Sequence, residues 1–106
     1  MVVRQRVGRK RYIAFEIISS GTDVTRSKLT RTIDKRTESL SERFPFEVMF
    51  ILRGRGIVRT DHRHPGALAE ILNSFSREAD GFELRTLATS GTIRTLKEKY
   101  FKQGAP

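Results

Sequence analysis

A β-hairpin pattern in the middle of the sequence restricts the fold more than any other feature. Two apolar segments of strand length, Phe46 to Arg53 and Ile57 to His62, flank the short connection Gly54-Arg55-Gly56. Glycine is common in such connections because it adopts backbone conformations that other residues avoid. A segment with helical spacing lies on each side of this hairpin, and a further strand pattern lies beyond each of them. The hairpin is therefore expected to lie between two helical crossovers of one sheet.

The two outer strands are predicted from alternation and from turn residues. Apolar residues at every second position predict the first strand over Arg11 to Ser19. The second outer strand is predicted over Phe82 to Thr89, directly after the turn residue Gly81. Both strands are long enough to cross a sheet of ordinary size.

Three helices are predicted from apolar spacing. The first covers Thr25 to Arg43 and stops at Pro45, which cannot continue a helix. The second covers about Ala67 to Ala79, and the third runs from Ser90-Gly91-Thr92 to about Lys102. The residues expected to face the core from the first two helices are Leu29, Ile33, Leu40, Phe44, Leu68, Ile71, Leu72 and Phe75.

The order β-α-β-β-α-β with an additional C-terminal helix predicts an α+β fold. It is typical of a two-layer, ferredoxin-like (RNA-recognition-motif-like) α/β sandwich, with a four-stranded antiparallel sheet and helices on one face. We expect a basic N-terminal arm over residues 1–10, a single domain over 11–102 and a short tail over 103–106. This fold alone decides no function, because it occurs in RNA-binding modules, ligand sensors and enzymes.

The sheet face opposite the helices is unusually apolar in this prediction. Its side chains would include Tyr12, Met49, Ile51 and Leu87. Such a face is normally polar when it contacts water, so these residues need a cover. Either the last helix provides it, or a protein partner or a second copy of the chain does.

The charge of the chain favours a polyanionic partner. The 106 residues carry a net charge of +9, from 21 Lys and Arg against 12 Asp and Glu. Five of the first eleven residues are basic and none is acidic. Neutralising phosphates releases their counterions, so nucleic acid is the favoured partner, with plain solubility as the alternative.

Other classes of protein are excluded or disfavoured by composition. The absence of cysteine excludes disulfides and thiolate metal sites. The longest apolar run, Val48 to Leu52, is five residues and far too short to span a membrane. We expect a soluble, intracellular and specifically cytoplasmic protein without a membrane partner.

No catalytic or metal-binding residues are predicted. Asp61, His62 and His64 are residue types that bind metals or transfer protons, but histidines beside a Pro-Gly turn are more often surface residues. The sequence has no phosphate-binding loop of the known kinds and no nucleophile motif. The segment Arg53 to Thr60 lacks the aromatic residues with which RNA-recognition motifs stack on bases.

The segment Ser90-Gly91-Thr92 is a candidate phosphate site. Ser90 can cap the last helix, and Gly91 allows close approach of a ligand to the backbone. The N–H groups at a helix start attract anions, and Arg94 and Lys97 follow within about a turn. Simple capping is the alternative explanation for the same residues.

Three segments in order resemble a known family. They are Arg11 to Ile17 (RYIAFEI), Gly56 to Arg59 followed by His62, and Thr86 to Leu96 (TLATSGTIRTL). Together they resemble protein component 2 of archaeal ribonuclease P, which is related to a small subunit of eukaryotic ribonuclease P and MRP. The resemblance extends over about Arg11 to Tyr100.

The resemblance implies a subunit of the ribonucleoprotein that removes the 5′ leader from precursor tRNA. In that family the RNA subunit holds the catalytic Mg²⁺ ions, so this chain would bind no cofactor and contribute no catalytic residue. The partners implied are the ribonuclease P RNA, a larger protein subunit and a second copy of the chain, with precursor tRNA as the substrate of the whole particle. The apolar sheet face is the expected contact for the protein partner.

The RNA contacts expected are Arg9, Lys10, Arg11, Arg59, Arg94 and Lys97. Arg59 and Arg94 lie in the segments that carry the resemblance, whereas the arm residues are chosen for charge alone. Two further basic turns, at residues 53–56 and 63–66, match no motif of the family. The alternatives are a stand-alone RNA-binding module, a small-molecule sensor of the ferredoxin-like fold and a small nuclease, the last disfavoured because the acidic residues are scattered.

Overall fold

The computed structural model describes residues 10–20, 24–38 and 44–101. Arg9, Leu40, most of the predicted arm and the predicted tail lie outside these described residues. The elements in order are β1 (Lys10–Ser20), α1 (Arg26–Glu38), β2 (Phe46–Leu52), β3 (Arg55–Asp61), α2 (Pro65–Asn73), α3 (Arg77–Asp80), β4 (Phe82–Ser90) and α4 (Ile93–Tyr100).

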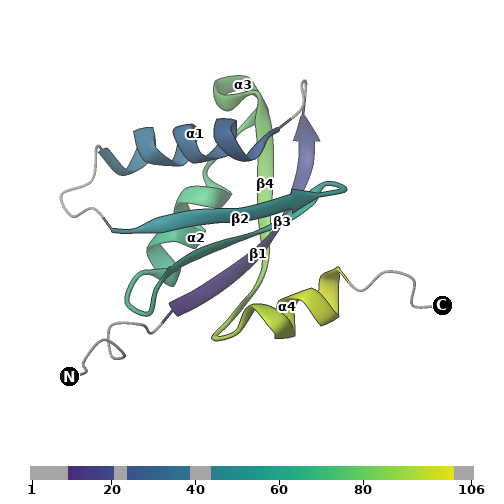
Figure 1. Cartoon of the computed structure of the whole chain (residues 1–106). Helices are drawn as coiled ribbons and strands as arrows, with labels where there is room; N and C mark the ends of the chain where they lie inside the picture. Colours follow the sequence, from purple (N-terminus) through teal and green to yellow (C-terminus); the bar gives the residue numbers. More distant parts are fainter. Residues whose placement is uncertain (1–9, 21–23, 39–43, 102–106) are drawn as a thin grey trace.

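The four strands form one antiparallel sheet in the order β2-β3-β1-β4. Helices α1 and α2 cover one face of the sheet, and α4 lies against the other (Figure 1). The predicted ferredoxin-like sandwich is therefore confirmed, and the C-terminal helix adds a partial third layer on the opposite face.

The main core lies between the sheet and helices α1 and α2. Alternate residues of β1, Ile13 and Phe15, point into it and are fully buried. They meet Leu29 and Ile33 of α1 on the same side of the sheet. The predicted residues Leu68, Ile71, Leu72, Phe75 and Phe44 are also buried there.

A second, smaller core lies beneath α4. Leu96 of α4 packs on Ala14 of β1 and Ile57 of β3, and all three side chains are almost completely buried. Tyr12 and Leu87 pack against this cluster and are partly buried. Of the two covers expected for the apolar face, the helix is the one observed.

A bulge in β2 corrects the prediction for Ile51. Val48 pairs with Val58, but the next paired residue is Phe50, opposite Ile57, so Met49 is an extra residue in the strand. An extra residue reverses which face the following side chains occupy. Phe50 therefore packs beneath α4 while Ile51 packs against the main core. The prediction that Ile51 lies on the α4 face is wrong, because it assumed uninterrupted alternation.

The hairpin connection is shorter than predicted. The turn consists of Arg53 and Gly54, with φ angles of 53° and 81°, the positive values of a two-residue hairpin turn. Gly56 belongs to β3 and is buried beneath the ring of Phe15. A Cβ atom at this position would lie 2.5 Å from Phe15 Cζ and 2.6 Å from the Phe50 carbonyl oxygen. Close approach of a ring and a backbone, rather than turn geometry, requires this glycine.

The second predicted helix is two helices. Helix α2 ends at Ser74, whose N–H donates to the Ile71 carbonyl at 3.1 Å. Helix α3 begins after Ser76, whose hydroxyl accepts the Ala79 N–H at 3.1 Å. The break allows Phe75 to enter the core, where it is 2% exposed. None of the helices in the described part of the chain is both long and apolar enough to cross a membrane.

Replacing Gly56 by alanine is expected to destabilise the protein strongly. The new Cβ would overlap both the Phe15 ring and the Phe50 carbonyl, so strand or core must shift. Overpacking of this kind costs about 3 kcal/mol, which lowers the melting temperature of a small domain by more than about 10 °C. Thermal unfolding followed by circular dichroism measures this.

Gly66→Ala is the matched control for that experiment. Gly66 lies in the first turn of α2, and nothing is within 4 Å of a Cβ built there. Alanine in a helix should leave stability unchanged or raise it by about 0.5–1 kcal/mol. Equal melting temperatures for the two variants would contradict the packing described for Gly56.

Candidate nucleic-acid interface

The strand register brings several predicted residues to one end of the sheet. Glu47 pairs with Arg59, Arg59 pairs with Tyr12, and Tyr12 pairs with Ser90. Two positions further along, Lys10 pairs with Asp61. Because paired residues share a face, this row lies on the same side of the sheet as α4. Helix α4 begins only three residues after Ser90, so its N-terminus lies at this end too (Figure 1).

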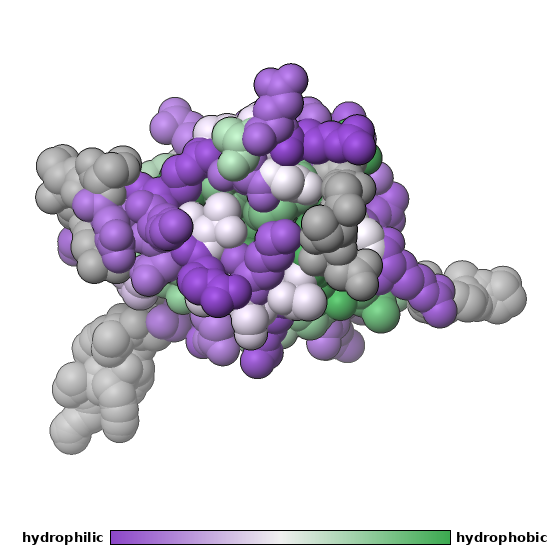
Figure 2. Space-filling view, turned by 90° about the horizontal axis from the view of Figure 1, so that it is seen from above, coloured by the Kyte–Doolittle hydropathy of each residue, from purple (hydrophilic) through white to green (hydrophobic). Residues whose placement is uncertain are grey.

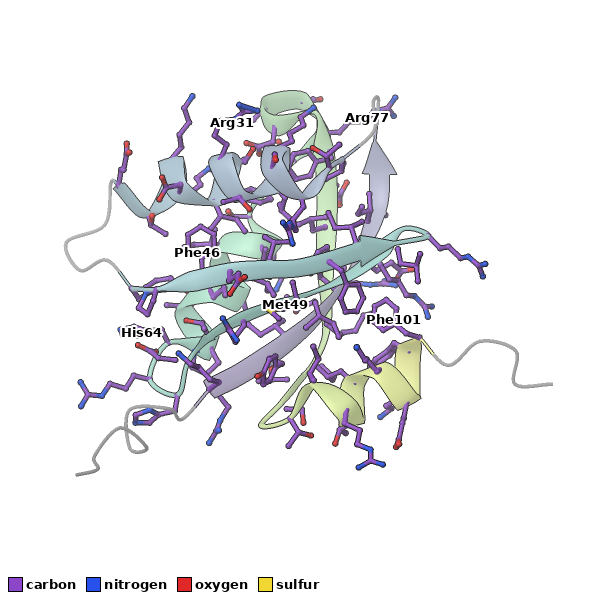
Figure 3. All side chains as sticks on the ribbon, viewed as in Figure 1. Arg31, Phe46, Met49, His64, Arg77 and Phe101 are labelled. Carbon is purple, nitrogen blue, oxygen red and sulfur yellow. The ribbon has the colours of Figure 1, made fainter. Side chains whose placement is uncertain are left out.

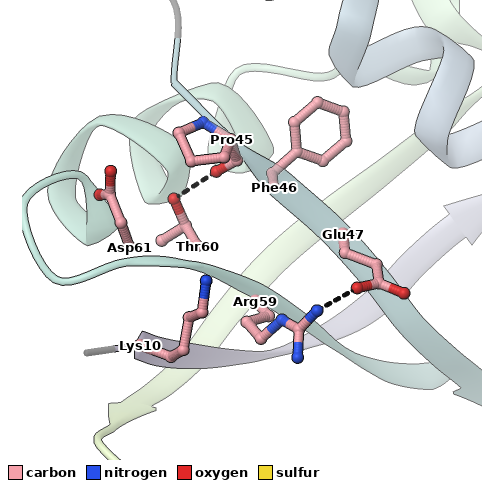
Figure 4. A pocket seen from close by; sticks show the side chains of 7 residues that line it. All are labelled: Lys10, Pro45, Phe46, Glu47, Arg59, Thr60 and Asp61. Atoms are coloured by element: carbon pink, nitrogen blue, oxygen red, sulfur yellow. Dashed lines mark hydrogen bonds and ion pairs between the residues drawn. The ribbon is translucent and has the colours of Figure 1, made fainter. Parts of the chain in front are cut away.

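Lys10 and Arg59 line a shallow pocket of about 100 Å³ between the ends of β1, β2 and β3 (Figure 4). The Arg59 guanidinium forms an ion pair with Glu47 across the β2–β3 ladder. The Thr60 hydroxyl donates to the Pro45 carbonyl at 2.7 Å. A pocket of this size is too small for a nucleotide, and the carboxylates of Glu47 and Asp61 line it beside the two cations.

Arg11 lies against the segment before α4. Its guanidinium Nη1 donates to the Lys10 carbonyl at 3.0 Å. The same nitrogen lies 3.4 Å from the position that a Cβ on Gly91 would occupy. Arg11 and Gly91, which are far apart in the sequence, are therefore neighbours in space.

The start of α4 corrects one detail of the prediction. The capping residue is Thr92, whose hydroxyl accepts the Thr95 N–H at 3.4 Å. The Ser90 hydroxyl accepts the Thr92 N–H at 3.2 Å and precedes the cap by two residues. The assignment of Ser90 as the cap is wrong, since β4 continues to this residue. Capping is observed, and phosphate binding by Ser90, Gly91 and Thr92 stays a prediction.

The two α4 residues that were predicted to contact RNA, Arg94 and Lys97, have different surroundings. The Arg94 side chain is 84% exposed and lies 3.4 Å from Glu98, one turn further along the helix. Lys97 Nζ lies 5.6 Å above the centre of the Phe50 ring, beside Leu52 at the hairpin end of β2. The structure thus gathers Lys10, Arg11 and Arg59 near the start of α4, and it places Lys97 toward the opposite end of the sheet.

Asp61 organises the loop between β3 and α2. Its Oδ1 atom accepts the N–H groups of Arg63 and His64 at 3.1 and 3.0 Å. His64 Nδ1 lies 2.7 Å from the same oxygen, and the imidazole stacks on Phe44 at 4.9 Å. Burial raises the pKa of Asp61, but the hydrogen bonds from His64 and Arg63 more than offset it and lower that pKa below its ordinary value.

The geometry assigns Asp61 and His64 to a structural role. Their polar atoms bond to each other and to the loop backbone. Within residues 10–20, 24–38 and 44–101, no group of three His, Cys, Asp or Glu side chains is placed to hold a metal ion.

The predicted protein-partner residues do not form one exposed surface. Tyr12, Met49 and Leu87 are half-buried beneath α4, and Ile51 lies on the other face. Because α4 covers the face with which RNA-recognition motifs stack on bases, stacking on this sheet is blocked there as well. Glu47, Phe50 and Phe101 were missed by sequence reasoning, and only the pairing register and the bulge reveal where they lie.

Comparisons with known proteins give the fold and leave the family open. No protein-family model matches the sequence, and no curated protein matches it at a significant level. A chain in a cryo-EM structure of yeast ribonuclease MRP superposes with a TM-score of 0.64. The match covers 81% of this chain and 76% of that chain at 11% sequence identity. The two proteins share a fold.

Asp61→Asn is expected to lower stability at neutral pH and to matter less in acid. The variant loses the carboxylate charge that the His64 ring and two N–H groups contact, a cost of about 1 kcal/mol at this partly exposed site. Because the fold lowers the pKa of Asp61, its contribution is complete above the ordinary value of 3.8. It is lost as the pH falls through the lowered pKa.

Melting temperatures between pH 7 and pH 2.5 test this prediction. The difference between wild type and Asp61→Asn should be about 4–8 °C at pH 7 and should shrink as the pH falls below the ordinary pKa of 3.8. Exposed Glu70 of α2 provides the control, since Glu70→Gln should change little across the range. A difference that stays constant with pH would mean that the Asp61 charge has no stabilising role.

Proposed function

We propose that this protein is an RNA-binding subunit of a ribonucleoprotein of the ribonuclease P and MRP type. The observation that carries the proposal is the fold shared with a chain of yeast ribonuclease MRP over 81% of this chain. A net charge of +9 and the cations gathered near the start of α4 support an RNA partner.

The sequence resemblance supports a finer form of the proposal. The segment Thr86 to Leu96, which carries most of the resemblance to component 2 of archaeal ribonuclease P, forms the end of β4 and the start of α4. This is where Arg11 approaches Gly91. The finer proposal is that the chain is the counterpart of component 2 and helps the RNA to remove the 5′ leader from precursor tRNA. A larger protein subunit and the RNA would be its partners.

The chain would act through contacts to the RNA backbone. Lys10, Arg11 and Arg59 lie on adjacent strands at one end of the sheet, and Arg94 extends from the first turn of α4. Cations on a rigid sheet neutralise phosphates without the cost of ordering the backbone and release counterions. Folded RNA then needs fewer divalent ions to bring its own phosphates together. Bond cleavage would belong to the RNA and the Mg²⁺ that it holds.

Leader release from a precursor tRNA at low Mg²⁺ concentration tests the proposal. Four reactions would contain this protein alone, the ribonuclease P RNA of the same organism alone, the protein with the RNA, and both together with the larger protein subunit. The expected result is either cleavage only in the reaction that contains all three components, or more cleavage with the protein and the RNA than with the RNA alone. Cleavage by the protein alone would overturn the proposal. No effect in any reaction with an active RNA would reduce the chain to a stand-alone RNA-binding module.

A charge-removal variant tests which surface contacts the RNA. Replacing Lys10, Arg59 and Arg94 together by alanine should weaken RNA binding by about 10- to 100-fold at moderate salt. The slope of log affinity against log salt concentration should fall by about two to three, since each lost phosphate contact removes roughly 0.7–0.9. Filter binding or fluorescence anisotropy over a series of salt concentrations measures both quantities.

The matched control removes the same number of charges from the opposite side of the molecule. Arg31 and Lys35 of α1 and Arg77 of α3 are exposed on a largely hydrophilic surface (Figures 2 and 3). Their replacement by alanine changes the net charge equally and should leave the salt slope nearly unchanged. If both triple variants lost the same affinity, the binding would depend on total charge and the proposed interface would be wrong.

A further inference from the structure

Helix α4 leaves an apolar recess at the hairpin end of the sheet. The recess, here called the hairpin groove, is lined by Phe50, Leu52, Lys97 and Phe101 and has a volume of about 330 Å³. Leu52, the last residue of β2, is 48% exposed. Phe101 follows the last turn of α4 and is labelled at that end of the helix in Figure 3. The helix is thus too short to cover the apolar face of the sheet as far as the turn.

Two of the aromatic rings in and beside the hairpin groove, Phe50 and Tyr100, have a cation above a ring face, and Phe50 also contacts Phe101. Phe50 and Phe101 meet edge to face, with centroids 5.0 Å apart and an interplanar angle of 80°. Lys97 Nζ lies 5.6 Å above the Phe50 ring. Arg55 and Lys99 lie 5.9 and 5.8 Å from the centre of the Tyr100 ring. A nucleic-acid base stacks on an open ring face, and the cations over Phe50 and Tyr100 reduce the ring surface left for stacking, so this arrangement favours a compact apolar side chain instead.

The surroundings of the hairpin groove are strongly basic. Lys97 lines it, Arg53 and Arg55 form the adjacent turn and strand start, and Lys99 follows on α4. The nearby acids Glu16 and Glu98 each face another arginine: Arg85 lies 3.0 Å from Glu16, and Arg94 lies 3.4 Å from Glu98. The charge that would complement this rim is negative.

We infer that the hairpin groove binds an acidic peptide segment of a partner protein. A leucine, isoleucine or phenylalanine of that segment enters between Leu52 and Phe101, and flanking carboxylates contact Lys97 and the arginines of the turn. The apolar side chain supplies most of the affinity, and the basic rim selects for acidic flanks and speeds association. The inference does not depend on the proposed function, because the segment binds at the end of the sheet away from Lys10 and Arg59 and without RNA.

The test is a selection from a random 12-residue peptide library displayed on phage, using the full chain as bait. Selected peptides are then synthesised with a fluorescent label, and their dissociation constants are measured by anisotropy. We expect enrichment of sequences that combine Asp or Glu with one large apolar residue. Replacing that apolar residue by alanine should weaken binding at least tenfold, and raising the salt from 50 to 300 mM should weaken it several-fold.

Two variants with matched exposure locate the site. Leu52→Glu should weaken the selected peptides more than tenfold, because it places a charge in the groove and repels acidic flanks. Ile18→Glu introduces the same charge at a side chain that is also 48% exposed but does not line the groove, and it should bind like the wild type. Leu52→Ser serves as a second variant if the glutamate lowers the melting temperature.

Three outcomes would overturn the inference: no enrichment from the library, enriched peptides without acidic residues, or equal losses in the Leu52 and Ile18 variants. If a labelled oligouridine bound the wild type and only Leu52→Glu abolished that binding, the groove would be assigned to RNA instead. Failure of leader release in the reactions described above would contradict the proposed function alone, because the peptide measurement contains neither RNA nor precursor tRNA.

Discussion

The packing of Leu96 on Ala14 and Ile57 determines how this sheet can be used. A two-layer sandwich of this type leaves one sheet face open, and that face often serves as a binding platform. Here three almost fully buried side chains close its centre. Burying a leucine contributes about 2–3 kcal/mol, a large share of the stability of a chain this size. The centre of this face is therefore closed, and the surfaces left on it lie beside the two ends of α4.

The regular spacing of apolar residues was enough to predict the fold. The errors in the prediction come from single residues that interrupt this spacing. Alternation along β1 and helical spacing in α1 agree with the structure because many residues repeat the same signal. The extra residue at Met49 carries no such signal, since a five-residue apolar run looks the same with or without a bulge. The break between α2 and α3 at Ser74–Ser76 was missed for a related reason. Phe75 has the spacing expected of an apolar helix residue, although it enters the core from the loop between the two helices.

The sequence predicted the basic character of the candidate interface, but only part of the relative placement of its residues. A basic segment at residues 9–11 indicates an anion partner without any structure. That Arg59 lies between Tyr12 and Glu47 follows from the pairing of three strands, which the sequence does not reveal. For Lys97, the sequence suggested a common site that the structure does not show. Its spacing from Arg94 suggested one common site, whereas its contact with Phe50 places the Lys97 side chain toward the hairpin end of the sheet.

Two basic surfaces on one small protein can still have different partners. At the β1–β3 end, Lys10 and Arg59 line a pocket together with Glu47, Asp61 and Thr60, and under the proposed function these two cations would contact successive RNA phosphates. At the hairpin groove, basic residues surround an exposed leucine and two phenylalanine rings. An RNA backbone has no apolar group to bury there, and an acidic peptide has too few charges to replace a row of phosphates. Under the two proposals, the apolar content beneath the charge would decide which partner each surface takes, and salt would weaken RNA binding far more steeply than peptide binding.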